Sequence, residues 1–202
     1  RNCPVDLVPT FLGAHAVPTE WAAHPDGYVD EIIGKMLPAV CGGESPLRPR
    51  FFDVFCEEGA FSLPQTRKLL TAAQVLGLGL KVHADEFSVL GAAGLAAELG
   101  AVSADHLACT PASEMEQMAA AGVVAVLLPG TTFGLGQTHY ADARTMVSMG
   151  LPVALGTDLN PGTCWCESMP FIISLACRYL RLTPAEAIVA ATVCAITVYD
   201  MC

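Results

Sequence analysis

The stretch KVHADEF, residues 81–87, decides the fold that this sequence predicts. An apolar run over residues 76–82 leads into it and ends in three ionisable side chains within four positions, His83, Asp85 and Glu86. The pattern predicts a buried strand whose carboxyl end carries chemistry, because strand ends and the loops after them form the reaction face of parallel α/β folds. His83 is then a candidate metal ligand or general base, and Glu86 a candidate proton shuttle. By itself the stretch fits a solvated strand end with a satisfied histidine equally well.

Strands and helices alternate on both sides of this stretch. Apolar strands are expected over residues 5–17, 51–56, 76–82, 101–105, 123–128 and 151–157. Helices are expected over residues 28–37, 62–76, 88–99, 111–121, 140–149, 169–182 and 183–197. Thr183 and Glu186 form an S/T-x-x-E capping box at the start of the last helix. Six successive βα alternations predict a parallel sheet.

Four of the six expected strands end in an ionisable residue of catalytic type: His15, His83, His106 and Asp158. Packing alone explains four such endings poorly, because a buried imidazole or carboxylate is costly without partners. Imidazole and carboxylate ligands suit a divalent metal, and a catalytic metal site keeps one position open for water. The four residues together therefore favour metal-assisted hydrolysis, with the strand-end aspartate passing a proton from water to a leaving nitrogen.

Composition limits the partners and the compartment. The 202 residues are 53% hydrophobic and 15% charged, which suits a parallel sheet covered on both faces. A net charge of −10, with only ten lysines and arginines, argues against nucleic acid and anionic membranes. No apolar stretch is long enough to span a bilayer. Nine cysteines without a disulfide framework fit a reducing compartment such as the cytoplasm, and the Cys164-x-Cys166 pair is a weak metal motif.

Five motifs carry a resemblance to a known family: FLGAHAVP, DVFCEEGAF, KVHADEF, ADHL and ALGTDLNPG, in this order. Together they resemble imidazolonepropionase, a histidine-degradation enzyme of the amidohydrolase superfamily. The resemblance implies a (β/α)8 barrel with a small β-sandwich. It also implies hydrolysis of the ring amide of 4-imidazolone-5-propanoate to N-formimidoyl-L-glutamate, with one Zn or Fe ion, a small-molecule substrate and a possible homodimer.

The resemblance also implies roles for single residues. His83 and Asp158 would be metal ligands, and Asp158 would shuttle the proton of a water that His106 orients or activates. Glu86 would contact the imidazolone ring and assist proton transfer. Substrate binding would involve His15, Glu86, Asn160, Gly162 and Thr163. Glu57 and Glu58 are left without a role, and His24 and His139 are expected to be solvent-exposed loop residues.

Two features depart from the family pattern. The sequence contains no H-x-H, the motif that supplies the other two metal ligands, and the substrate-binding arginine that follows that motif is missing with it. Residues 1–202, which open on Arg1 without a leader, are therefore expected to be an internal part of the barrel domain. About six βα units would be present, and the first two strands and the β-sandwich would be absent. The tail after Cys194 also departs from the family.

Two other hypotheses remain open. A deaminase of a heterocyclic base, in the same superfamily, would also use a strand-end histidine, a nearby glutamate and a final aspartate, but it would release ammonia. A non-catalytic fragment would instead expose two unpaired sheet edges, which are an aggregation hazard. The glycine-containing stretch FGLG, residues 133–136, is expected to be a turn or lid.

Overall fold

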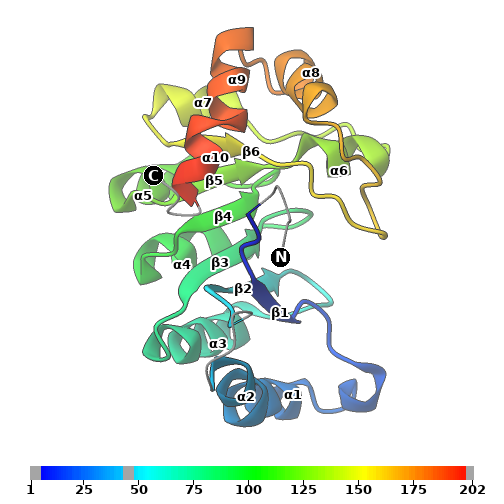
Figure 1. Ribbon diagram of the computed structural model, residues 1–202, viewed down its shortest axis with the longest axis vertical. Helices are drawn as coiled ribbons and strands as arrows, with labels where there is room; N and C mark the ends of the chain where they lie inside the picture. Colours follow the sequence, from blue (N-terminus) through cyan, green and yellow to red (C-terminus); the bar gives the residue numbers. More distant parts are fainter. Residues whose placement is uncertain (1–5, 43–47, 199–202) are drawn as a thin grey trace.

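A six-stranded parallel sheet forms the centre of the computed structural model, which describes residues 6–42 and 48–198 (Figure 1). Each strand pairs with the strand before it in the chain, in the order β1-β2-β3-β4-β5-β6. The strands are β1 (Thr10–Ala14), β2 (Phe51–Cys56), β3 (Gly79–Ala84), β4 (Ser103–His106), β5 (Val124–Leu127) and β6 (Val153–Leu155). A strand order without reversal is that of a (β/α)8 barrel, of which six βα units are present. The predicted partial barrel is confirmed.

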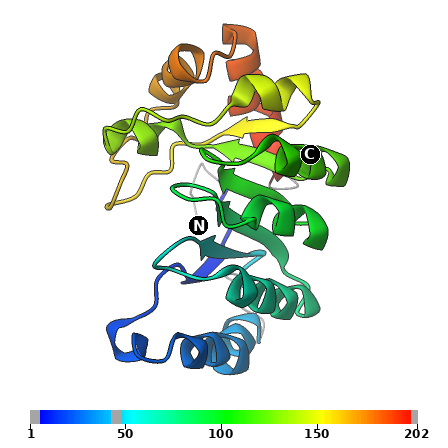
Figure 2. The same cartoon turned by 180° about the vertical axis from the view of Figure 1, so that it is seen from behind.

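The connections place helices along one side of the sheet. Right-handed crossovers between neighbouring parallel strands put successive helices on the same face, and α3, α4 and α5 lie together there (Figures 1 and 2). The helical segments are η1 (Thr19–Trp21), α1 (Pro25–Glu31), η2 (Ile32–Met36), α2 (Leu37–Cys41), α3 (Leu63–Val75), α4 (Ala92–Leu99), α5 (Ala112–Ala121), α6 (Pro129–Gly134), α7 (Ala143–Ser148), α8 (Met169–Tyr179), α9 (Pro184–Ala191) and α10 (Val193–Val198). None of the helices described in residues 6–42 and 48–198 could cross a membrane.

The two faces of the sheet differ in chemistry. Val54, Val82 and Ala104 are fully buried and belong to the hydrophobic core. Side chains alternate between the faces of a strand, so the residues before and after each of these three point to the opposite face. Four of those residues are polar yet buried: Asp53, Lys81, Ser103 and Asp105. The sheet therefore has an apolar face beneath the helices and a face whose centre carries charge.

Local signals in the sequence place several helix ends correctly. At α9 the Thr183 backbone N–H donates to the Glu186 carboxylate at 2.8 Å, which confirms the capping box. The helix expected over 28–37 spans α1, η2 and α2. Its π-helical turn precedes Pro38, which lacks the N–H that an α-helix would pair with the Gly34 carbonyl.

Other boundaries differ from expectation. The helix expected from Ser88 begins at Ala92, because Gly91 adopts φ +84° and the Ser88 hydroxyl is bound to Glu57, which follows β2. Phe133 and Gly134 belong to the last turn of α6 rather than to a turn or lid. The last expected helix is divided into α9 and α10. The start of the first expected strand at Val5, part of the loop near 43–47 and the tail at 199–202 lie outside the described residues.

Candidate active site

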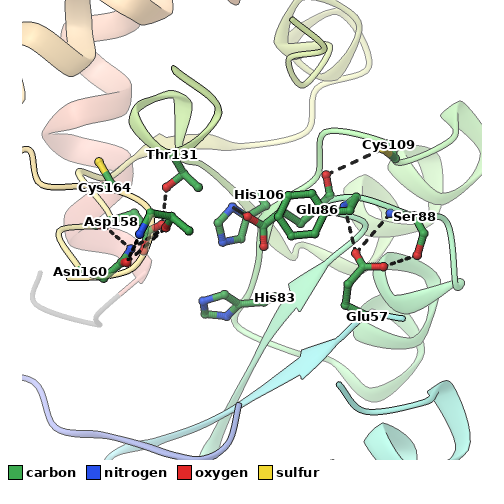
Figure 3. Close-up of polar contacts among 12 residues, drawn as sticks. Glu57, His83, Glu86, Ser88, His106, Cys109, Thr131, Asp158, Asn160 and Cys164 are labelled. Carbon is green, nitrogen blue, oxygen red and sulfur yellow. Dashed lines mark hydrogen bonds and ion pairs between the residues drawn. The ribbon is translucent and has the colours of Figure 1, made fainter. Parts of the chain in front are cut away.

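The predicted site residues come from four different strands and lie together at the carboxyl ends of the strands. His15 follows β1, His83 lies in β3, His106 ends β4 and Asp158 follows β6. The ring centroids of His83 and His106 are 5.0 Å apart, and those of His15 and His83 are 4.4 Å apart. Figure 3 shows the rings of His83 and His106 beside Asp158. The structure therefore brings these predicted residues together, as parallel strand ends should.

The backbone at these strand ends is unusual. Among the described residues, Asp85, His106 and Asp158 adopt φ values of +51°, +73° and +52°, in the left-handed region that favours glycine. Non-glycine residues in this region cost free energy and cluster at active sites. Asp85 immediately follows β3, His106 ends β4, and Asp158 lies three residues after the end of β6, so all three belong to the turns that leave the carboxyl ends of the strands.

Glu86 and His106 are in contact and have opposite pKa shifts. His106 Nδ1 lies 3.5 Å from Glu86 Oε1, and both side chains are buried. Burial, reinforced by the charge of His83, lowers the pKa of His106 to about 3. Burial, together with the charge of Asp158, raises the pKa of Glu86 to about 7. With these pKa values His106 is neutral at neutral pH, so the contact with Glu86 is not an ion pair, and Glu86 has a pKa suited to proton exchange.

Asp158 is held by contacts from β6's loop and from α6. Thr131 donates a hydrogen bond from its hydroxyl to Asp158 Oδ2 at 2.5 Å. In the loop, the Asn160 amide nitrogen donates to the Asp158 carbonyl at 2.8 Å, while its oxygen accepts from the backbone N–H of Gly162 and Thr163. The Asn160 side chain thus shapes the turn that carries Asp158, and the predicted role of Asn160, Gly162 and Thr163 in lining the substrate pocket stays a prediction.

Helix α6 packs closely against the same loop. A Cβ atom at Gly134 would lie 2.5 Å from the Thr163 carbonyl oxygen, so only glycine permits this approach. The Cys164 thiol contacts the Thr157 carbonyl at 3.1 Å, and all the cysteines of the described residues are free thiols. The glycine stretch that the sequence suggested as a turn or lid is therefore a packing surface for the loop around Asp158.

Glu57, which the sequence left without a role, is buried and anchors the loop after β3. Its carboxylate accepts hydrogen bonds from the backbone N–H of Phe87 at 2.9 Å and of Ser88 at 3.2 Å, and from the Ser88 hydroxyl (Figure 3). Burial alone would raise the pKa of Glu57, but these hydrogen bonds outweigh it and lower the pKa. Glu86 lies immediately before the anchored residues. By contrast Glu58, its neighbour, is exposed.

Asp53 is the second residue that the sequence did not reveal. It lies in the middle of β2 and is 3% exposed, and its Oδ1 atom is 2.9 Å from His83 Nδ1 and 3.9 Å from His15 Nε2. Burial alone would raise the pKa of Asp53, but the charge and hydrogen bond of His83 and the nearby His15 hold it well below its usual range. Burial opposes ionisation of His83 as well, yet the charge of Asp53 raises the pKa of His83 to about 9. A charged residue within an apolar strand was the available signal.

The donors fit a divalent metal. His15, Asp53 and His83 offer ligand atoms that all lie within 4.8 Å of one another. His15 Nε2 is buried without a hydrogen-bond partner, and the Asp53 contact occupies only Nδ1 of His83. Nitrogen and carboxylate donors are the set that zinc and iron accept. The predicted ligand Asp158 lies at the same edge. His24 and His139, expected as exposed loop residues, are exposed.

Comparison with known proteins gives a consistent family. The chain is 54% identical over 192 residues to the imidazolonepropionase of Syntrophobacter fumaroxidans, covering 95% of this chain and 44% of that protein. It is 52% identical over 193 residues to that of Symbiobacterium thermophilum, covering 96% and 45%. The chain is a relative of the imidazolonepropionases. It spans about half the length of these curated relatives. No family model matches.

Solved structures of other proteins share the fold of this chain. A zinc-bound adenosine deaminase from Xanthomonas campestris superposes with a TM-score of 0.69 at 20% identity, covering 94% of this chain and 47% of that one. A guanine deaminase from C. acetobutylicum with guanine bound gives 0.63 at 17% identity, covering 88% and 47%. At these identities the likeness shows the fold alone, and the relation to imidazolonepropionases depends on the sequence matches.

Proposed function

We propose that the protein containing this chain is a metal-dependent hydrolase that opens the ring of 4-imidazolone-5-propanoate to N-formimidoyl-L-glutamate, in histidine degradation. The observation that carries the proposal is that His83, Glu86, His106 and Asp158 lie together at the carboxyl ends of the strands, in a chain 54% identical to an imidazolonepropionase. Those relatives are twice as long, so the activity belongs to the whole protein.

His83 and Asp158 are the ligands that this chain contributes to one zinc or iron ion. The bound ion would polarise the ring carbonyl and promote ionisation of a water molecule. The fit depends on the free Nε2 of His83 and on the carboxylate that Thr131 holds in place. Since two protein ligands are fewer than a catalytic zinc site generally uses, the remaining ligands come from outside these residues.

The chain's own residues handle the proton. Hydrolysis adds the oxygen of water to the ring carbonyl carbon, breaks the C–N bond and leaves one proton of the water on the departing nitrogen. His106, neutral because of its low pKa, orients the water by accepting a hydrogen bond. Asp158 accepts the proton that the water loses. Glu86, with a pKa of about 7, contacts the ring and assists the transfer to nitrogen, since a pKa near the working pH is best suited to this task.

Substrate binding is assigned to residues around this group. His15 stands beside His83, with its side chain 31% exposed, and is placed to meet a ligand. Asn160, Gly162 and Thr163 form the turn after Asp158 that would line the pocket. A cavity of about 400 Å³ opens beside Glu86, between Phe87, Cys109 and the segment 136–139. Among the proposed site residues only Glu86 lines this cavity.

The remaining assignments concern the whole protein. Residues 1–202 form part of a single barrel domain, which two further strands and a β-sandwich would complete. The ligand is a small molecule rather than nucleic acid or a membrane, since the chain carries a net charge of −10. We assign the protein to the cytoplasm, because its described cysteines are all unpaired. A homodimer is the oligomer that the resemblance suggests.

Asp158→Asn in the full-length protein tests the function. The amide keeps the shape of the side chain but cannot take a proton, so kcat should fall at least ~100-fold while the fold persists. Asp142→Asn is the matched control, because Asp142 is an exposed helix N-cap, where asparagine serves equally well. Loss of the imidazolone and appearance of the formimidoyl product are followed together, with thermal unfolding as the check on folding.

Two outcomes contradict this function. Near-normal kcat in the Asp158→Asn variant would remove Asp158 from the mechanism. Release of ammonia from a heterocyclic base, without opening of the imidazolone ring, would make the protein a deaminase, the other activity compatible with these residues. Ring opening by the unmodified protein, with no ammonia released, supports the proposal.

A further inference from the structure

Asp53 occupies a position that needs an explanation. It lies between Phe52 and Val54, both fully buried, in the centre of the sheet. A carboxylate there is unfavourable unless it is paired and hydrogen-bonded. Its partner is the Nδ1 atom of His83, at 2.9 Å, and the same oxygen lies 3.9 Å from His15 Nε2. One carboxylate oxygen therefore faces two histidines with separate proposed roles.

The register of the strands explains which nitrogen Asp53 meets. His83 pairs with Phe55, and Asp53 pairs with Lys81, so Asp53 lies two residues nearer the amino end of the sheet on the same face. From there its carboxylate reaches Nδ1, which then carries the proton that it donates. Once Nδ1 is protonated in the neutral ring, the lone pair resides on Nε2. An imidazole in this tautomer, fixed by a carboxylate on the other nitrogen, is the form that binds metals.

We propose that Asp53 is a positioning residue: it fixes the tautomer and ring orientation of His83 for metal binding and links this ligand to His15. The inference depends on the proposed function, in which His83 binds the metal. Asp53 does not bind the metal itself. The oxygen that is hydrogen-bonded to His83 also lies within ion-pair distance of His15, so a change at residue 53 alters the surroundings of both histidines.

A direct ligand role for Asp53 is the alternative that the distances raise, because His15, Asp53 and His83 form a compact group of donors. The contact of 2.9 Å between Asp53 Oδ1 and His83 Nδ1 has the length of a hydrogen bond, which argues against it. If both atoms bound one ion, that hydrogen bond would be lost, and with it the contact that pairs the buried charge. The two roles predict different losses of affinity.

The test is the zinc affinity of the full-length protein, measured by competition with a chelator. Asp53→Asn should weaken zinc binding roughly 10- to 100-fold, the range found when a partner of a metal-binding histidine is removed. His83→Ala should weaken it far more. Asp105→Asn is the matched control: Asp105 is a buried aspartate on the same face, in β4, bonded to Ser103 rather than to a histidine. Its variant should stay close to the unmodified protein.

A second measurement observes the His83 ring directly, first in the unmodified protein. In the metal-free protein above the His83 pKa of about 9, where the ring is neutral, ¹⁵N NMR should show a proton on Nδ1 and none on Nε2. The Nδ1 proton should lie far downfield, as expected for a proton shared with a buried carboxylate. In Asp53→Asn this resonance should move strongly upfield, while Asp105→Asn should leave it in place. A purely structural role for Asp53 would change thermal unfolding without changing this signature. The proposal thus remains testable even if the Asp53 variant folds poorly.

Each outcome separates the inference from the proposed function. If His83→Ala keeps full zinc affinity, the proposed metal site is wrong and the inference falls with it. If His83→Ala loses zinc but Asp53→Asn does not, only the positioning role is overturned. If Asp53→Asn loses as much zinc affinity as His83→Ala, Asp53 is a ligand. If Asp53→Asn and Asp105→Asn lose the same zinc affinity, Asp53 acts only through its negative charge. Both results would overturn the inference, as would an unprotonated Nδ1.

Discussion

Thr131 shows how a single hydroxyl can control a reactive carboxylate. It is 2% exposed, at the start of α6, and it donates to the Asp158 oxygen at 2.5 Å. Asp158 itself has a left-handed backbone, so its main chain lies in a conformation that is unfavourable for a residue other than glycine. The hydrogen bond from Thr131 and the amide of Asn160 together hold this arrangement in place.

Thr131→Val should therefore lower kcat more than it raises KM. Valine keeps the β-branched shape but removes the donor, and a hydrogen bond to a charged group contributes about 1.5–3 kcal/mol, or roughly 10- to 100-fold in rate. Thr71→Val is the control, because Thr71 is exposed and its hydroxyl donates to the Arg67 carbonyl of its own helix. Steady-state kinetics of both full-length variants decide the point: equal activities would show that Thr131 does not support Asp158.

Glu86 should make stability depend on pH. Burial raises its pKa from 4.5 to about 7, so the folded protein holds this proton more tightly than the unfolded chain does. Its unfavourable contribution therefore develops as the pH rises from the unfolded pKa toward the folded one, and it is complete above that range. Glu86→Gln carries no charge and should gain stability over the unmodified protein, with a larger gain at about pH 8 than at about pH 5.

The comparison is made on metal-free protein by thermal unfolding at both pH values. Glu116→Gln, which changes an exposed carboxylate on α5, is the control and should show no such difference. A gain for Glu86→Gln that is the same at both pH values would show that the carboxyl of Glu86 titrates alike in the folded and unfolded protein.

Glu57 connects two elements of the site, because it follows β2 and binds the loop that follows β3. It leaves the end of β2 and anchors residues 87–88, which follow β3, so two neighbouring strand ends move as one unit. Each of its two oxygens accepts two hydrogen bonds. Oε2 accepts them from the backbone N–H groups of Phe87 and Ser88, and Oε1 from the Glu58 N–H and the Ser88 hydroxyl. All four partners are donors, which only a carboxylate can satisfy.

Glu57→Gln should loosen this connection. The glutamine amide nitrogen is itself a donor and must face the donors of Glu58 or of Phe87 and Ser88 on one side, so some of these partly buried hydrogen bonds are lost. The amides of Phe87 and Ser88 should exchange with solvent faster, and kcat should fall because Glu86 precedes them. Glu58→Gln, at the exposed neighbouring residue, should change neither. Hydrogen exchange followed residue by residue gives the answer, and unchanged protection at both amides would contradict the anchoring role.

The sequence predicted some parts of this arrangement well and others not at all, for physical reasons. Strand ends are visible because an apolar run stops at an ionisable residue, as at His83 and Asp158. The partners of those residues are not visible in the sequence, since Asp53 is 30 residues away from His83 along the chain and Thr131 is 27 residues away from Asp158. The helix expected from Ser88 begins only at Ala92, because the Ser88 hydroxyl donates to Glu57 from another part of the chain and Gly91 has a left-handed backbone.

At the scale of the molecule, the sheet has two outer strands that each pair on one side within the described residues. On β1, Leu12 is 51% exposed, and Leu7 just before the strand is 74% exposed. Unpaired parallel edges with apolar side chains promote association between chains. In a closed barrel both edges would be paired, so the fold itself indicates where the remainder of a full-length relative would attach.

The 202 residues expressed alone should hold metal weakly and lack activity. His83 and Asp158 give a metal two donors, whereas catalytic zinc sites generally use three protein ligands and water. Zinc or iron should therefore be lost on desalting, imidazolone hydrolysis should be absent, and the free edges should make the chain self-associate. Metal analysis, a substrate-loss assay and light scattering test the three parts, with the full-length protein as the control. One tightly held ion per chain with measurable turnover would mean that other residues of this chain, His15 and Asp53 first, complete the metal site.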